Sequence, residues 1–382
     1  MILYVFVLAT TTFAAFLVEG GAVCFRGRTS CFPARQAVIR RSALAGIFLM
    51  LFLLSALRFE TGNDYVRYEE IFRRIWGGWV VPTEPGFNVF IKGLQYVFGE
   101  TNYIVFFAIF AFFTVLFMLR ALYVLSENFA FSFFLFMCFG YYFNSMNTMR
   151  YYLAVAVAMW AISFIHRKKY GKFVLAILVA ALFHKSVLLV IPIYLLANVT
   201  WKLWSVILIS AFGVSGLFLG KYYLKLILIL YPSYNNTEYL EGGTSYANIL
   251  RCALVVGMCL LFWKNSWREN KQYRMYFRLN VGALLLYLCG SFIPEVSRIG
   301  TYMTITQVFL IPGVVKSISA SDENVQNNAS TNEGSKNIDA RKKVFLTTFA
   351  AVMAAVFYFI FWLYKAYGDV IKLLPYHSWI FM

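Results

Sequence analysis

The chain has 382 residues, of which 61% are hydrophobic, 20% aromatic and only 13% charged. This composition excludes an ordinary soluble domain, and its repeated long apolar runs predict an all-α, polytopic integral membrane protein rather than a β-barrel. The net charge of +17 does not indicate nucleic-acid binding, because most lysines and arginines lie in short loops between apolar runs, where they act as topology signals.

The first apolar run, 2–18, has no basic residue before its core and therefore predicts a membrane span rather than a cleaved signal peptide. A short loop with five arginines follows: Arg26, Arg28, Arg35, Arg40 and Arg41. Such a loop is typical of the cytoplasmic side, so we expect the N-terminus outside. Cys24 and Cys31 share this loop, but no further cysteine or histidine joins them to form a zinc set. We expect no metal, no cofactor and no disulfide framework.

A second span at 42–57 leads to residues 58–101, which we interpret as an external loop. Within it, the stretch 87–98 is apolar but short and interrupted by polar residues. If this stretch crossed the membrane, the later basic cluster 166–169 would lie outside, against the charge rule. The loop is therefore expected to contain a re-entrant or interfacial helix.

Residues 172–198 admit two interpretations: one long helix with His184 inside the membrane, or two short segments with 183–186 at an outer turn. One helix would put the later basic cluster 264–278 outside, so the two-segment hairpin is favoured. Further spans are expected at 102–125, 129–143, 149–165, 203–219, 247–263, 279–293, 299–315 and 344–364. The total is about twelve spans, with the C-terminus outside.

Two polar segments complete the organisation of what we expect to be a single integral membrane domain, 1–382. Residues 220–246 begin with an amphipathic run and predict a second external loop. Residues 317–343 are rich in Ser, Asn, Asp and Glu, and predict a disordered cytoplasmic loop. Four other cysteines lie in or beside apolar runs and are interpreted as small apolar residues: Cys138, Cys252, Cys259 and Cys289.

Under this topology five polar clusters lie on the outer face: 63–68, 84–86, 144–150, 184–186 and 295–302. In the third cluster, Asn144, Asn147 and Arg150 recur every three residues and would share a helix face. An arginine at the end of a span is costly unless it faces water, a partner or a ligand. The clusters together predict an outward-facing vestibule that binds an oxygen-rich ligand.

Simpler interpretations remain open for the individual residues. Arg150 is compatible with a snorkelling side chain at a helix end. Asp64 is compatible with an ion pair to Arg67 or Arg58, and Glu84 with a cap on the following helix. His184 is compatible with a hydrogen-bonded anchor.

Five short motifs occur in a fixed order between the apolar spans. They are N-D-Y-x-x-Y (Asn63, Asp64, Tyr65, Tyr68), E-P-G-F (Glu84 to Phe87), N-x-x-R (Asn147, Arg150), F-H-x-S (Phe183, His184, Ser186) and R-x-x-x-Y (Arg298, Tyr302). Over about residues 55–305 this pattern resembles the EpsG family of membrane polysaccharide polymerases, which is related to Wzy-type polymerases. The chain departs from the family pattern at Tyr151, where members often have glutamine.

The resemblance implies a GT-C-like membrane glycosyltransferase of the bacterial plasma membrane. It would join oligosaccharide repeat units carried on undecaprenyl pyrophosphate into a capsule, exopolysaccharide or O-antigen at the outer face. Cationic side chains can stabilise the pyrophosphate leaving group without a metal or nucleotide. Arg150 and Arg298 are expected to bind it, and Arg67 and Lys185 to assist. The candidate general bases are Asp64, Glu84 and His184. The other expected substrate contacts are Asn144, Asn147, Tyr65, Tyr68, Ser186 and Tyr302.

Other functions are compatible with the same residues. A lipid-sugar-dependent glycosyltransferase or ligase would use the same leaving group. A transporter or flippase of lipid-linked oligosaccharide would distribute polar residues through a central cavity, often with inverted repeats, whereas here they gather on one face. The expected partners are the lipid-linked oligosaccharide substrate, membrane lipid, and the flippase and chain-length regulator of the same pathway, but no nucleic acid.

Overall fold

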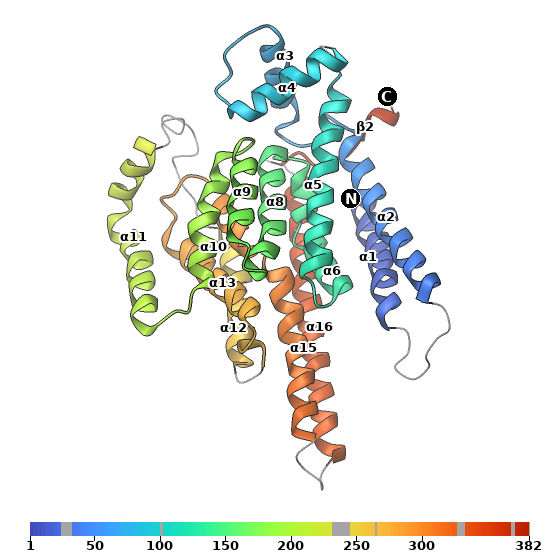
Figure 1. The fold of residues 1–382 in the computed structure, drawn as a ribbon, viewed down its shortest axis with the longest axis vertical. Helices are drawn as coiled ribbons and strands as arrows, with labels where there is room; N and C mark the ends of the chain where they lie inside the picture. The colour runs from blue at the N-terminus through green and yellow to red at the C-terminus, as the bar shows by residue number, and fades with distance from the viewer. Residues whose placement is uncertain are drawn as a thin grey trace. The chain divides into compact units, whose positions relative to one another are not determined.

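Figure 1 shows the fold as a computed structural model, which describes residues 1–23, 33–99, 102–230, 245–263, 266–326, 333–367 and 371–381. Among these residues, five helices are long and apolar enough to cross a membrane: α1 (Ile2–Val23), α2 (Pro33–Ala56), α5 (Tyr103–Leu125), α8 (Met149–His166) and α16 (Glu333–Ala366). The described strands are two residues long, so the prediction of an all-α membrane protein is confirmed. The count of about twelve spans stays a prediction.

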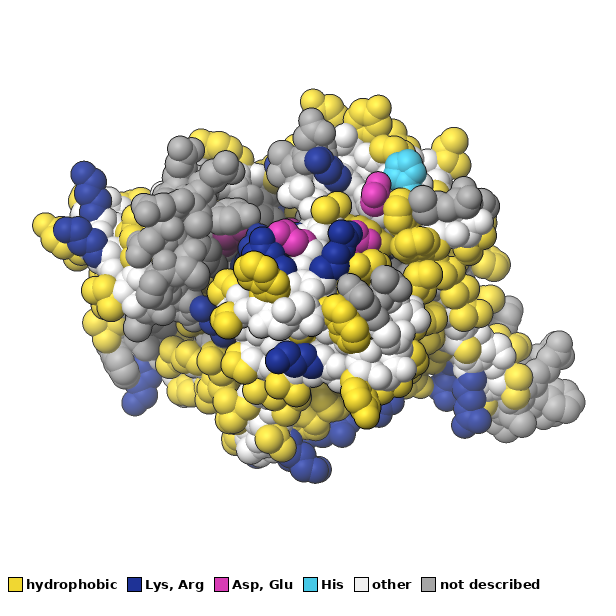
Figure 2. Space-filling model, turned by 90° about the horizontal axis from the view of Figure 1, so that it is seen from above, with side chains coloured by type: hydrophobic (Ala, Val, Ile, Leu, Met, Phe, Trp, Pro, Cys, Tyr) yellow, Lys and Arg dark blue, Asp and Glu magenta, His cyan; other side chains and the backbone are white. Residues whose placement is uncertain are grey.

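The exposed hydrophobic side chains agree with the assignment to the all-α membrane proteins. Many large apolar residues on the membrane-length helices face outward, including Phe13, Phe113 and Phe357. Figure 2 likewise shows hydrophobic side chains over much of the face that it presents, with acidic and basic side chains among them. Because a soluble protein exposes few contiguous apolar patches, these surfaces are expected to contact lipid.

The chain divides into two compact units, a division that the sequence analysis did not predict. Unit 1 comprises Met1–Leu188 and Thr347–Met382. Besides α1, α2, α5, α8 and the end of α16, it contains α3 (Tyr65–Trp76), α4 (Pro85–Phe98), α6 (Phe129–Cys138), α7 (Tyr141–Ser145) and α9 (Tyr170–Ala181). Helix α1 packs on α2 and α6, and α5 packs on α2 and α8. Helix α8 also packs on α9.

The core of unit 1 centres on α8. Its residues Ala154, Ala158 and Ala161 are fully buried. Small side chains let neighbouring backbones approach closely, which favours packing between membrane helices. Helix α8 is therefore held firmly by its neighbours. The backbone position of a residue at its N-terminal end, such as Arg150, is fixed with it.

The segments predicted to be external gather at one end of unit 1. The Tyr4 hydroxyl, at the start of α1, donates to the Leu373 carbonyl at 2.6 Å. Strand β1 (Arg58–Phe59) pairs antiparallel with β2 (His377–Ser378), with Arg58 opposite Ser378. The Trp362 indole on α16 donates to Asn144 Oδ1 at 2.9 Å. The two termini and the segment after α2 thus lie together.

One predicted span of unit 1 contains an unexpected break, and the break expected within 172–198 is present. The run 129–143 is divided at Gly140, which has φ +73° and separates α6 from α7. A Cβ there would lie 2.9 Å from Trp362 Cδ1, so glycine is required both for the turn and for this contact. The segment 172–198 forms α9, a turn at 182–184, a 3₁₀ turn (Lys185–Leu189) and α10 (Val190–Asn198). The two-segment interpretation of this region is confirmed, and a single long helix is excluded.

Unit 2, Leu189–Leu346, is organised around α13 (Lys271–Cys289). Around α13 pack α10, α11 (Leu203–Leu230), α12 (Tyr246–Leu261), α14 (Val296–Thr304) and α15 (Gln307–Gln326). The predicted span 299–315 is divided by a turn at 305–306 between α14 and α15.

Two predicted loops differ from the structure or lie partly outside it. The amphipathic start of 220–246 is the end of α11, and 231–244 lies outside the described residues. The segment 317–343 was expected to be disordered, but α15 continues to Gln326 and α16 begins at Glu333. Helices propagate at one hydrogen bond per residue once nucleated, so apolar helices extend into polar flanks. Cys24 and Cys31 also lie outside the described residues, whereas the other four cysteines are buried.

Candidate functional site

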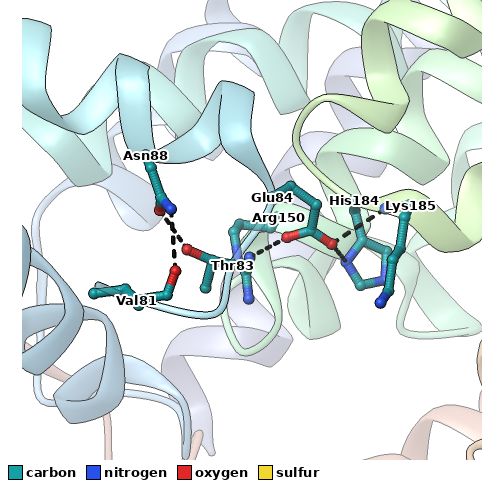
Figure 3. A network of polar contacts seen from close by, with 7 residues as sticks. All are labelled: Val81, Thr83, Glu84, Asn88, Arg150, His184 and Lys185. Atoms are coloured by element: carbon teal, nitrogen blue, oxygen red, sulfur yellow. Dashed lines mark hydrogen bonds and ion pairs between the residues drawn. The ribbon is translucent and has the colours of Figure 1, made fainter. Parts of the chain in front are cut away.

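The site is built around Glu84, which immediately precedes α4 (Figure 3). Glu84 has extended backbone angles, φ −62° and ψ 139°, and Pro85 begins the helix, where its missing N–H costs nothing. The Glu84 side chain makes no capping hydrogen bond, so the capping interpretation is excluded. Asn88 holds the preceding loop by accepting from the Thr83 hydroxyl and donating to the Val81 carbonyl at 3.2 Å. The carboxylate is therefore directed away from its own helix.

A close backbone approach places Glu84 beside the turn after α9. The Phe87 N–H donates to the Leu182 carbonyl at 3.1 Å. A Cβ at Gly86 would lie 2.5 Å from Leu182 Cβ and 2.8 Å from its carbonyl oxygen. Real Cβ atoms essentially never approach so closely, so glycine is needed at this position. This explains the Gly in the E-P-G-F motif: it lets α4 dock on the 182–184 turn.

The Glu84 carboxylate contacts three groups from two other elements. Its Oε2 accepts from Arg150 Nη1 at 2.6 Å, and its Oε1 lies 3.6 Å from His184 Nδ1 and accepts from the Lys185 N–H at 3.2 Å (Figure 3). The side chains of Glu84, Arg150 and His184 are only 12%, 17% and 13% exposed. A charge-assisted bond is strong in such partly dry surroundings, and the carboxylate is held between two cationic or cationisable groups.

Aromatic rings position Arg150. Its guanidinium lies 4.6 Å from the centre of the Phe87 ring and 5.8 Å from that of Tyr68. Burial raises the pKa of Tyr68, with the positive charge of Arg150 acting in the opposite direction, so the phenol stays neutral at physiological pH. Arg150 donates to Glu84 and is also hydrogen-bonded to Tyr68, whereas its Nε has no hydrogen-bond partner among the described residues. The guanidinium is fixed in place, and its Nε–H is still available to a ligand.

Tyr151 and Phe87 complete the surroundings of the cluster. The Tyr151 ring lies edge-on to His184, with centres 5.5 Å apart. The sequence analysis gave neither Tyr151 nor Phe87 a role in the site. Two sequence signals could have identified them. One is the aromatic residue directly after the arginine of N-x-x-R, and the other is the aromatic residue at the end of E-P-G-F.

The two asparagines of the 144–150 segment act as anchors. Asn147 Oδ1 accepts from the Asp64 N–H at 3.2 Å, and Asn144 accepts from Trp362 as described above. Gly62, with φ +98°, lies against the Met146 carbonyl, so the segment before α3 is seated on the turn before α8. These bonds hold the α8 N-terminus, and thus Arg150, relative to the neighbouring segments.

The other predicted site residues of unit 1 lie around the cluster or in the core. Asp64 is the residue before α3, one turn from Tyr68. Tyr65 is 1% exposed and stacks on Phe107 at 4.4 Å, so it supports α3 from within rather than presenting its ring at the surface. Arg67 is exposed and makes no ion pair or hydrogen bond within the described part of the chain. Ser186 follows Lys185 in the 3₁₀ turn.

Arg298 and Tyr302 belong to α14 of unit 2. Arg298 Nη2 lies 3.0 Å from Glu295 Oε1, in an ion pair whose side chains are 29% and 19% exposed. Tyr302 is fully buried, and its carbonyl accepts from the Tyr194 hydroxyl at 2.5 Å. Tyr302 therefore helps to fix α14 on α10, while Arg298 lies at the start of α14. Within the described ranges of both units, no three His, Cys, Asp or Glu side chains are grouped so as to hold a metal ion.

The arrangement can bind an anion and accept a proton. Arg150 and Lys185 supply positive charge, and Glu84 and His184 are titratable groups beside it. A family model described as EpsG family matches residues 44–328, which include every residue of this cluster and the Arg298–Glu295 pair. No curated protein and no solved structure matches the chain.

Proposed function

Because the chain belongs to the EpsG family, we propose that it is a membrane polysaccharide polymerase that joins undecaprenyl-pyrophosphate-linked repeat units at the outer face of the bacterial plasma membrane. The observation that supports this most is the Glu84–Arg150–His184 cluster, because it combines a positioned phosphate-binding group with candidate bases. A side chain that only snorkels would not need a buried carboxylate and two aromatic rings around it.

In the proposed reaction, a hydroxyl of one lipid-linked unit attacks the anomeric carbon of the chain on the other lipid. The new C–O bond forms as the bond from the anomeric carbon to the pyrophosphate oxygen breaks, and its electron pair leaves on the lipid pyrophosphate. The hydroxyl proton passes to Glu84 or His184. Arg150 stabilises the negative charge that develops on the leaving group.

The Glu84–Arg150 ion pair suggests how these roles are coupled. While Arg150 is paired with Glu84, one oxygen of the carboxylate is occupied by the guanidinium. A pyrophosphate that binds Arg150 offers it two or more oxygens and competes with Glu84 for the guanidinium. The carboxylate is then released beside the substrate, within reach of His184. Arrival of the leaving group would therefore free that carboxylate oxygen for the attacking hydroxyl.

Unit 2 offers a second guanidinium of the same kind. Arg298 is paired with Glu295 and is less buried than Arg150. A polymerase handles two lipid pyrophosphates in each cycle, one on the donor and one on the acceptor. We therefore assign Arg298 to a second phosphate contact.

Alanine substitutions at the two arginines test the proposal. Arg150→Ala, and separately Arg298→Ala, are expected to lower polymerisation by about a hundredfold or more, the cost of losing a charge-stabilising donor. Cells with either variant should lose long-chain polysaccharide and accumulate single lipid-linked repeats, detected by gel electrophoresis and mass spectrometry. Arg74→Ala is the matched control, because Arg74 forms an exposed ion pair with Glu70 on α3.

The gel pattern also separates the alternatives. A ladder of products indicates polymerisation, whereas single additions indicate a transferase or ligase. Normal chain length in both arginine variants, with the protein present in the membrane, would refute the pyrophosphate assignment.

A further inference from the structure

Unit 1 contains an apolar groove of about 560 Å³ between α5, α8 and α9. Its lining is hydrophobic apart from Lys172, near the start of α9. The wall includes exposed apolar residues such as Phe113 and Leu175, which are 43% and 63% exposed. Because these side chains face outward on membrane-length or neighbouring helices, the groove is accessible to a chain that lies in the bilayer.

The groove begins at Leu153, one helical turn from Arg150, and follows one face of α8. Leu153, Val157, Trp160 and Phe164 line it and recur at helical spacing below Arg150. From Arg150 to Phe164 an α-helix rises about 21 Å, or some two thirds of a bilayer core of about 30 Å. The groove therefore extends from the turn next to the cluster along the apolar length of α8.

Aromatic packing joins the groove to the site. Phe110 of α5 lines the groove. The centre of its ring lies 5.8 Å from that of Phe87, whose ring contacts the Arg150 guanidinium. Phe110 also contacts Phe90 and Phe183, at 5.7 Å and 6.1 Å, and both of these line the groove as well. Phe183 directly precedes His184. One layer of rings thus forms the floor of the cationic cluster and the upper wall of the groove.

This combination specifies the chemistry of an occupant. Arg150 and Lys185 lie close in the chain to the lining residues Leu153 and Phe183 and can contact an anionic group, while the groove itself accepts a hydrocarbon chain. Such a ligand has a phosphate head directly attached to a long apolar tail. A polyprenyl pyrophosphate has this form, since its first isoprenoid unit follows the phosphate without a glycerol or sugar spacer.

We propose that the groove holds the phosphate-proximal part of the polyprenyl tail of a lipid-linked substrate, with its pyrophosphate at Arg150. This inference rests on the proposed function and adds a specificity site to it. The groove would align the anomeric carbon with Glu84 by fixing the lipid below it. It would also select polyprenyl carriers over the phospholipids that surround the protein.

Photocrosslinking tests the occupant with the full-length protein in lipid nanodiscs. Benzoylphenylalanine is placed at Leu175, which lines the groove, or at Leu178, which does not. Both residues are exposed on α9, at 63% and 48%, so either position tolerates a bulky replacement. Undecaprenyl pyrophosphate without a sugar is the probe, and phosphatidylglycerol is the competitor. We expect crosslinks to the probe at 175 but not at 178, with little loss when phosphatidylglycerol is in excess.

A groove-filling variant provides an independent measurement. Ala176→Trp places a large ring in the groove, and Leu178→Trp adds the same ring outside it. Ala176→Trp is expected to weaken binding of undecaprenyl pyrophosphate about tenfold or more, and Leu178→Trp to leave it unchanged. Equal crosslinking at both positions, or equal competition by phosphatidylglycerol, would show an ordinary lipid surface and overturn the inference.

The outcomes distinguish this inference from the proposed function. Crosslinking confined to position 175, together with normal polysaccharide length in cells that lack the protein, would retain the groove and refute the polymerase assignment. Loss of polymer in Arg150→Ala cells, without selective crosslinking at 175, would retain the polymerase and refute the groove.

Discussion

Gly86→Ala tests whether the close contact between α4 and the 182–184 turn is needed for activity. The new Cβ would lie 2.5 Å from Leu182 Cβ, and the gap must widen to at least 3.4 Å for an ordinary contact, a shift of 0.9 Å. Overpacking of this kind costs about 1–3 kcal/mol. The shift also moves Glu84 relative to His184, and a misplacement of about 1 Å lowers catalysis roughly a hundredfold.

Gly93→Ala is the matched control on the same helix. A Cβ at Gly93 meets nothing within 4 Å, and alanine should favour the helix by up to about 1 kcal/mol. Both variants are compared for melting temperature in detergent and for polysaccharide chain length in cells. We expect Gly86→Ala to lose long chains and Gly93→Ala to keep them. Normal chain length with Gly86→Ala would show that the docking of α4 does not position Glu84.

Three further predictions follow from the same geometry. Glu84→Gln keeps the shape of the side chain but removes its charge and basicity, so polymerisation should fall about a hundredfold or more. Glu70→Gln, which removes the exposed ion pair with Arg74 on α3, should have no effect on chain length. Gly140→Ala should lower the melting temperature, because φ +73° costs a non-glycine residue about 1 kcal/mol or more and the new Cβ meets Trp362. Gly46→Ala, with open space around its Cβ, should leave the melting temperature unchanged. Equal stability of the two variants would show that Gly140 is not required for the break between α6 and α7. In a variant without native cysteines, Asn63→Cys should react with a membrane-impermeant maleimide in intact cells and Lys172→Cys only after permeabilisation; the reverse pattern would place the cluster on the cytoplasmic side.

Charge patterning in the sequence was sufficient to predict several parts of the fold. The break at 183–186 followed from the position of a later basic cluster, and the structure has it between α9 and the 3₁₀ turn. The helix within 87–98 was also expected, and it is the body of α4. Topology signals act over whole loops, so they locate turns well. They do not locate interruptions inside apolar runs, such as Gly140, because these depend on packing against Trp362.

The site was predicted as a set of residues but not as an arrangement. Glu84, Arg150 and His184 were each singled out, but the ion pair that joins Glu84 to Arg150 was not predicted, because their roles were assigned separately. The rings of Phe87 and Tyr151 were missed, since aromatic residues are too common in this chain to stand out. Tyr65 was expected at the substrate, but its ring is buried against Phe107. The ion pair and the positions of these three rings all depend on contacts between segments that are distant in the sequence.

The most direct measurement of the central claim uses the purified protein, reconstituted with a single lipid-linked repeat unit. Mass spectrometry follows both products, the elongated lipid-linked chain and the free polyprenyl pyrophosphate. The account predicts that wild-type protein releases one polyprenyl pyrophosphate for each new linkage and that Arg150→Ala releases almost none. Elongation by Arg150→Ala at the wild-type rate, or repeat units left unjoined by the wild-type protein, would contradict it.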